Sequence, residues 1–201
     1  MITIIDYGLG NIRSLMNWFK RASIEVNFSS DMTVIESSNV LILPGVGAYE
    51  DAMKKLEEKN LVEALKCHVR KNKPLVGICL GMQLLYESSM EGGYFKGLGF
   101  IPGEIVSFDE NRVKVPQMGW NSISSKDSRF DDTYVYFVHS FYAKSDFSEV
   151  VAYTEYDVKV PAIVKKNNVF GFQFHPEKSG EIGQEMLKLI KELEDDYISS
   201  N

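Results

Sequence analysis

The sequence predicts an α/β fold: a flavodoxin-like, doubly wound and mostly parallel sheet with an added antiparallel segment. In the first half of the chain, short β-branched or apolar runs alternate with segments of helical periodicity, which is typical of parallel strands joined by right-handed crossovers. In the second half, the runs are short and many alternate apolar with polar residues, which indicates antiparallel pairing. No linker, repeat or low-complexity tract separates the halves, so we expect one domain over residues 1–201.

The composition excludes several classes of protein. The 22 basic and 28 acidic residues give a net charge of -6, which argues against a nucleic-acid partner or a membrane surface. Two cysteines cannot form a disulfide framework, so a cytoplasmic location is expected. The three histidines and two cysteines lack the spacing of metal ligands, and no Walker-type phosphate loop is present. We therefore expect neither a metal nor a cofactor.

The elements of the first half follow from apolar patterning. Asn11 is expected to cap a helix whose apolar face carries Ile12, Leu15 and Phe19. The run Val40-Leu41-Ile42-Leu43 is wholly apolar, as expected for a strand that is covered on both faces. By the same criteria, strands are expected at 2–5, 25–28, 40–43 and 74–78, and further helices over 49–56 and 61–69.

The second half is expected to contain mainly short strands and one closing helix. The helix presents Ile182, Met186 and Leu193 on one side. The strands are expected at 104–106, 113–115, 121–123, 134–138, 150–153, 162–164 and 169–174.

The stretch Gly77-Ile78-Cys79-Leu80-Gly81 places a cysteine between an expected strand and an expected helix. Gly-x-nucleophile-x-Gly is the pattern of a nucleophile elbow, a crowded turn in which larger flanking side chains would clash. Such a turn would hold the Cys79 thiol above the sheet edge, where the first N–H groups of a helix favour a thiolate. A buried core cysteine is the alternative interpretation, because free cysteines are among the most buried residues.

A histidine and a carboxylate follow the last expected strand. His175 is separated from Glu177 only by Pro176, so the carboxylate can accept a hydrogen bond from one ring nitrogen while the other nitrogen faces a thiol. Together with Cys79, these residues would supply a nucleophile, a base and an orienting group. A surface turn is the alternative interpretation. His68 falls on an expected helix and is expected to be exposed and uninvolved.

The chain resembles the class I (triad) glutamine amidotransferases from end to end. Three motifs carry the resemblance: Leu43-Pro44-Gly45-Val46-Gly47, Gly77-Ile78-Cys79-Leu80-Gly81-Met82-Gln83 and Gly171-Phe172-Gln173-Phe174-His175-Pro176-Glu177. The resemblance implies the class I glutamine amidotransferase fold. It also implies that Cys79 attacks the side-chain amide of glutamine, that His175 transfers protons and that Glu177 orients the imidazole.

The resemblance also assigns binding roles around the cysteine. The tetrahedral oxyanion would be bound by the backbone N–H of Leu80 and by the Val46-Gly47 peptide, which two flanking glycines would allow to reorient. The residues that would hold glutamine are Gly47, Gln83, His139, Ser140 and Phe141, with His139 to Phe141 and Gly47 acting through their backbone groups.

One branch of the family is matched more closely, the glutaminase subunit of imidazole glycerol phosphate synthase in histidine biosynthesis. The matching segments include Ile4-Ile5-Asp6-Tyr7-Gly8-Leu9-Gly10-Asn11, Pro116-Gln117-Met118-Gly119-Trp120-Asn121 and Phe137-Val138-His139-Ser140-Phe141-Tyr142. In one departure, Gln117 stands where the family often has histidine. The branch implies a heterodimer in which ammonia passes into a (β/α)8-barrel cyclase subunit. The interface residues expected by resemblance are Asn11, Gln117, Met118, Trp120, Tyr136 and Lys178.

Several alternatives remain at this point. Trp120, flanked by Gly119 and Asn121, suits either a core position or an interface anchor. The same chemistry could supply ammonia to a sugar-modifying synthetase of surface-polysaccharide biosynthesis. A γ-glutamyl peptidase of the same fold would need no partner. A non-catalytic binding subunit would be expected to lack part of the triad, whereas Cys79, His175 and Glu177 are all present.

Overall fold

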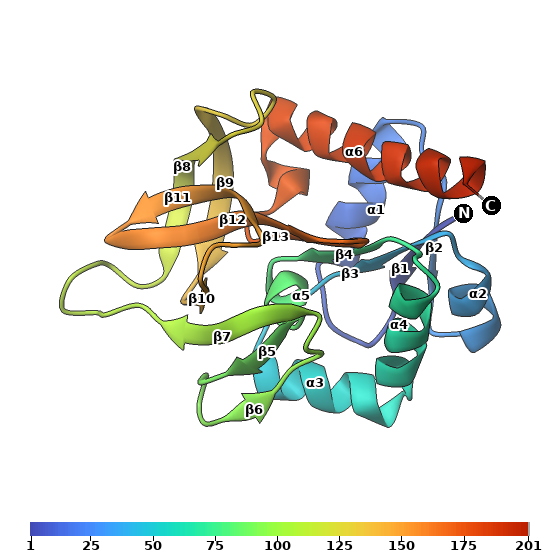
Figure 1. Ribbon diagram of the computed structural model, residues 1–201, viewed down its shortest axis with the longest axis horizontal. Helices are drawn as coiled ribbons and strands as arrows, with labels where there is room; N and C mark the ends of the chain where they lie inside the picture. Colours follow the sequence, from blue (N-terminus) through green and yellow to red (C-terminus); the bar gives the residue numbers. More distant parts are fainter. Residues whose placement is uncertain (201) are drawn as a thin grey trace.

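A nine-stranded sheet forms the centre of the computed structural model, which describes residues 1–200 (Figure 1). Its strand order is β2-β1-β3-β4-β13-β12-β11-β8-β9. The first five strands are mutually parallel: β2 (Val26–Ser29), β1 (Ile2–Ile5), β3 (Val40–Leu43), β4 (Leu75–Ile78) and β13 (Val169–Phe172). The apolar runs that predict β1, β3 and β4 are buried along their whole length.

The second half of the chain extends this sheet with antiparallel strands and adds a smaller sheet. The antiparallel strands are β12 (Val158–Lys166), β11 (Val150–Tyr156), β8 (Gln117–Ser125) and β9 (Thr133–His139). The smaller sheet has the order β10 (Phe141–Lys144), β7 (Ile101–Ser107), β5 (Tyr86–Ser89) and β6 (Phe95–Lys96). The predicted fold class, a mostly parallel sheet with an antiparallel addition, is confirmed.

Helices cover both faces of the parallel strands, as Figure 1 shows. Helices α1 (Ile12–Arg21) and α6 (Gly180–Ser199) pack in one apolar cluster with Ile2, Ile4 and Val76. Helices α2 (Met32–Ser37), α3 (Tyr49–Glu58) and α4 (Leu61–Arg70) pack in a second cluster on the other face. Within residues 1–200, no helix combines the length and hydrophobicity needed to cross a bilayer.

Some expected elements differ from those observed. The expected strand at 113–115 is wrong, because these residues lie in the loop between β7 and β8. There the Lys114 carbonyl accepts a hydrogen bond from the Tyr156 hydroxyl at 2.6 Å instead of a strand partner, and Pro116 lacks the N–H that a ladder would need. Sequence patterning also missed four short elements, α2, β5, β6 and β10.

His68 is buried, so its expected exposure is wrong. The side chain lies on the inner face of α4 and is 4% exposed. Its Nε2 is 3.0 Å from the carbonyl oxygen of Pro74 and donates to it, since a carbonyl can only accept. Burial lowers the pKa of His68 to about 4, with a further contribution from Lys73 and Lys71. The neutral ring therefore ties α4 to the start of β4.

This burial makes the stability of the fold depend on pH. Because the pKa of His68 is lower in the folded chain than in the unfolded chain, the unfolded chain binds more protons between these values, and stability rises with pH. We expect the wild type to lose about 1 kcal/mol of unfolding free energy through His68 between pH 7.5 and pH 5.5. Measured by urea unfolding, the free energy of unfolding of His68→Leu should fall by about 1 kcal/mol less than that of wild type over the same pH interval. Equal slopes in the two proteins would contradict the assignment.

Candidate active site

Cys79 stands at a strained turn between β4 and the short helix α5 (Leu80–Gln83). Its φ of 55° and ψ of -113° are rare for a residue with a side chain. The flanking glycines are required by close approaches: a Cβ on Gly77 would lie 2.5 Å from the Gly81 carbonyl oxygen, and a Cβ on Gly81 would lie 1.9 Å from that of Leu43. The turn therefore has the geometry that the sequence predicts for a nucleophile elbow.

His175 follows β13, which is the parallel neighbour of β4. Its backbone N–H donates to the Tyr136 carbonyl at 2.9 Å, and its Nδ1 lies 2.9 Å from Oε1 of Glu177 in the 3-10 turn η1 (Pro176–Lys178). The Glu177 side chain is only 1% exposed. A carboxylate at this distance fixes the proton on Nδ1 and leaves Nε2 for another partner.

The second partner of the imidazole is Cys79. Burial of the ring disfavours its charged form, but the hydrogen bond to Cys79 and the hydrogen bond to Glu177 together raise the pKa of His175 to about 10. The arrangement therefore favours a charged imidazolium at His175, next to Cys79. The Cys79 sulfur also lies 3.9 Å from the carbonyl oxygen of Val138.

A cavity of about 340 Å³ opens over Cys79 and His175. It is the place where the sequence-predicted residues meet, although they come from segments far apart in the chain. The other expected residues that line it are Val46, Gly47, Leu80, Gln83, His139, Ser140 and Phe141. Glu177 is not part of this wall and contacts His175 from behind.

The loop after β3 is fixed at one end and free at the other. The Tyr7 hydroxyl donates to the Pro44 carbonyl at 2.6 Å, and a Cβ on Gly45 would lie 2.8 Å from the Gly81 nitrogen. In contrast, Val46 is 40% exposed, and Gly47 has a φ of +106° with no atom within 4 Å of a built Cβ. Val46 and Gly47 are therefore exposed and loosely packed, whereas the two residues before them are closely packed.

The carbonyl group of Phe141 positions two other residues that line the cavity. This oxygen accepts from Nε2 of Gln83 at 2.8 Å and from Nδ1 of His139 at 2.8 Å. Burial lowers the pKa of His139 to about 4, with a further contribution from His175. His139 is therefore neutral near pH 7, with its proton on Nδ1.

The sequence analysis missed Glu91, which also lines the cavity. Its Oε2 accepts from the Tyr49 backbone N–H at 3.2 Å, and partial burial raises its pKa above the usual range of a glutamate. The residue follows β5, one of the strands that patterning missed, so nothing in the sequence separated it from the other acidic residues of the chain.

Five of the six expected interface residues lie in β8, β9 or η1, and Asn11 directly precedes α1. Asn11, Met118, Trp120 and Lys178 are exposed, and Tyr136 is half-buried. Gln117 is 0% exposed and donates to Oδ1 of Asn121 at 3.1 Å, so its side chain does not present a docking surface.

Trp120 is 53% exposed, which excludes the core position for this residue. Its ring centroid lies 6.1 Å from that of Tyr136, and Lys178 Nζ lies 5.4 Å from the Tyr136 ring centroid. The indole is therefore a large apolar group on the surface, next to a cation over an aromatic ring.

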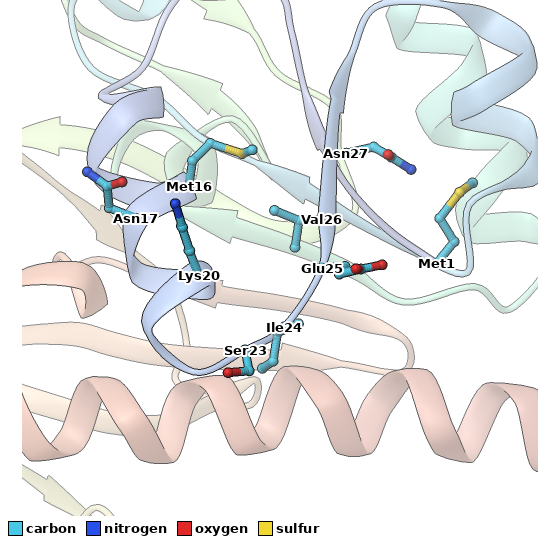
Figure 2. Close-up of a pocket in the computed structure, with 9 residues that line it drawn as sticks. All are labelled: Met1, Met16, Asn17, Lys20, Ser23, Ile24, Glu25, Val26 and Asn27. Carbon is cyan, nitrogen blue, oxygen red and sulfur yellow. The ribbon is translucent and has the colours of Figure 1, made fainter.

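A larger hollow of about 880 Å³ lies away from this cavity, between α1, the following loop and the edge strand β2 (Figure 2). The side chains that line it include Lys20 and Glu25 but no cysteine or histidine. Its hydroxyl and amine side chains, Ser23 and Lys20, have no histidine beside them in this lining, whereas Cys79 shares the smaller cavity with His175.

The glutamine amidotransferase class-I family model matches residues 3–191. The chain belongs to the class-I glutamine amidotransferase family. The resemblance carried by its three motifs is thereby confirmed, and the chain is a glutamine amidotransferase enzyme.

Two curated relatives of this glutamine amidotransferase are named imidazole glycerol phosphate synthase subunit HisH. The protein of Carboxydothermus hydrogenoformans is 44% identical over 199 residues, with 96% of this chain and 100% of the relative covered. That of Caldanaerobacter subterraneus subsp. tengcongensis is 46% identical over 202 residues, with 96% and 98% covered. A crystal structure of a glutamine amidotransferase superposes with a TM-score of 0.78 at 18% identity, covering 96% of this chain and 98% of the other, which supports the fold alone.

Proposed function

We propose that this glutamine amidotransferase is the glutaminase subunit of imidazole glycerol phosphate synthase. It hydrolyses glutamine to glutamate and ammonia in the cavity over Cys79 and passes the ammonia to a (β/α)8-barrel cyclase subunit in histidine biosynthesis. The observation that carries the proposal is that Cys79 and His175 line one cavity while Glu177 holds the His175 ring from behind. The near full-length similarity to proteins named HisH supports the choice of synthase.

The reaction begins with the Cys79 thiolate, which attacks the side-chain amide carbon of glutamine. The carbonyl becomes a tetrahedral oxyanion. His175, protonated and held by Glu177, gives its Nε2 proton to the amide nitrogen, and the C–N bond breaks to release ammonia and leave a glutamyl thioester. The neutral imidazole then takes a proton from water, which attacks the thioester. Glutamate leaves, and the thiolate–imidazolium pair is restored.

The oxyanion is stabilised by backbone N–H groups. Leu80 supplies the first, since it follows the nucleophile directly. The Val46–Gly47 peptide supplies the second after it turns, which the open space around Gly47 allows. Removing one such donor typically costs about 2.7–4 kcal/mol of barrier. The isolated chain is therefore a slow glutaminase until a partner holds this peptide in the turned position.

Glutamine is held at its amino-acid end by the far part of the cavity. Gln83 offers its side chain, and His139, Ser140 and Phe141 offer backbone groups. Glu91 supplies a carboxylate for the α-ammonium group, because it is the acidic residue that lines the cavity. One domain over residues 1–201 carries all of these groups.

Replacing Glu91 by glutamine tests this last assignment. Loss of the charge is expected to raise KM for glutamine about tenfold, because a hydrogen bond to a charged group contributes about 1.5–3 kcal/mol, while kcat changes by less than about threefold. Steady-state glutamate release measures both constants. Glu87→Gln is the matched control, since Glu87 is exposed and outside the cavity. Equal KM values for Glu91→Gln and wild type would reject the role.

The partner accepts ammonia before water protonates and disperses it. We assign the docking surface to exposed residues of β8, chiefly Met118 and Trp120, with Lys178 of η1 near them, because a large exposed aromatic suits an interface anchor. With two free cysteines, one of them the nucleophile, the heterodimer works in a reducing cytoplasm.

The proposal is tested by measuring glutamate release by the chain alone, with the cyclase subunit of the same organism, and with the cyclase subunit and its ribonucleotide substrate. Strong stimulation by the loaded cyclase is expected. A rate that ignores the cyclase would retain the glutaminase chemistry but reject this partner, and a full rate in the isolated chain would reject the turned-peptide mechanism.

A further inference from the structure

Gln173 is a buried amide behind the wall of the cavity. It follows β13, two residues before His175, and is 0% exposed. Its backbone N–H donates to the Ala162 carbonyl at 3.0 Å, so the residue is tied to β12. Its side-chain Oε1 accepts a hydrogen bond from Nε2 of Gln83 at 3.0 Å. Gln83 lines the cavity and Gln173 does not.

The hydrogen bonds fix which way the Gln83 amide faces. The Phe141 carbonyl can only accept, so the Gln83 atom 2.8 Å from it must be the NH₂ group. The second hydrogen of this NH₂ group goes to Oε1 of Gln173. These two acceptors fix the position and the plane of the Gln83 side-chain amide. Its carbonyl oxygen Oε1 then remains free to accept a hydrogen bond from a molecule in the cavity.

The arrangement carries a cost that a purely structural role does not explain. The Nε2 atom of Gln173 is buried and has no hydrogen-bond partner among the described residues. An unpaired buried N–H₂ group is destabilising. Because Gln173 is 0% exposed, an unbranched apolar side chain of similar volume would fill the same space without leaving an unpaired N–H group.

We propose that Gln173 is a positioning residue for the substrate: it holds the Gln83 amide so that its carbonyl oxygen accepts a hydrogen bond from glutamine. This inference rests on the proposed glutaminase function. Gln173 acts through Gln83 and does not touch the substrate. Its removal therefore weakens substrate binding without changing the chemistry at Cys79.

The kinetic test compares wild type, Gln173→Met, Gln83→Met and the double variant, each in complex with the cyclase subunit. Gln173→Met is expected to raise KM for glutamine about tenfold, the equivalent of about one hydrogen bond, with kcat within about threefold. Because Gln173 acts through Gln83, the double variant should have the kcat/KM of Gln83→Met within about twofold. The proposal would be overturned if the loss of kcat/KM in the double variant equalled the product of the losses in the two single variants. An unchanged KM in Gln173→Met would also overturn it.

A stability measurement separates positioning from a structural role. Gln173→Met should have an unfolding midpoint close to that of wild type, because the cost of the unpaired Nε2 is removed while the Gln83 NH₂ group loses one of its two acceptors. Thr154→Val is the matched control for loss of a buried hydrogen bond, since Thr154 Oγ1 donates to the Ser122 carbonyl at 2.8 Å away from the cavity. It should leave KM unchanged. A lowered midpoint in Gln173→Met with an unchanged KM would assign the residue to the fold instead.

A labelling test does not depend on turnover. A diazoketone analogue of glutamine should alkylate Cys79 with saturable kinetics, and Gln173→Met should raise the half-saturating concentration about tenfold. Alkylation by iodoacetamide, which lacks the amino-acid part, should proceed at the same rate in both proteins. Saturable labelling without glutamate release would reject the proposed glutaminase function, and the comparison of half-saturating concentrations would still test the positioning role of Gln173. Equal half-saturating concentrations in the two proteins would reject the positioning role of Gln173 alone.

Discussion

Replacing Cys79 by alanine is expected to lower the rate of glutamate release by at least about 10³-fold, because loss of the nucleophile removes the covalent route. The elbow holds Cys79 beside His175, and Cys79 is the one cysteine among the residues that line this cavity. The measurement is glutamate release by the complex with the loaded cyclase subunit, at saturating glutamine. The fold should be retained, because the sulfur of Cys79 is replaced by a smaller group.

The second cysteine provides the matched control. Cys67 lies on α4, outside the cavity, and is partly exposed. Cys67→Ala should release glutamate at the wild-type rate within about twofold. If Cys79→Ala kept more than about a tenth of the wild-type rate, the covalent mechanism would be wrong.

Replacing Gly81 by alanine is expected to lower the free energy of unfolding by at least about 3 kcal/mol and to abolish activity. The new Cβ would lie 1.9 Å from the Leu43 carbonyl oxygen and 2.8 Å from its carbon, so β3 and the elbow would have to separate. Both contacts are with backbone atoms, which cannot turn away as a flexible side chain can. Urea unfolding measures the loss of stability.

Gly92→Ala is the control for this prediction. Gly92 has a φ of +70°, which side chains rarely adopt, but nothing lies within 4 Å of a Cβ added there. The substitution should therefore cost only the conformational penalty of about 1–2 kcal/mol. If Gly81→Ala unfolded at the same urea concentration as Gly92→Ala, the close approach at the elbow would not be a constraint on the fold.

The parallel half of the fold was predictable because its signals are local and strong. The runs at Val40–Leu43 and Leu75–Ile78 are apolar enough to indicate strands covered on both faces, and both are fully buried. The segment at 113–115 has the same alternation as a strand, but its backbone is held by a side chain, Tyr156, that lies far away in the sequence. Such a contact leaves no trace in local patterning.

The reacting residues of the candidate site were also easier to predict than the residues that line its cavity. Cys79, His175 and Glu177 stand in motifs whose spacing itself has a chemical meaning. Glu91 has no such motif, and it reaches the cavity only because the short strand β5 places it there. Gln117 shows the opposite error, since its position in a matching segment does not reveal that its side chain turns inward to Asn121.

The most direct test of the glutaminase mechanism is an acid quench of the complex during turnover with glutamine, followed by mass spectrometry of the peptides that contain Cys67 and Cys79. A glutamyl thioester on Cys79, absent from Cys67 and absent when glutamate replaces glutamine, is the predicted result. Turnover with no acyl group on Cys79, or with the acyl group on another residue, would contradict the account.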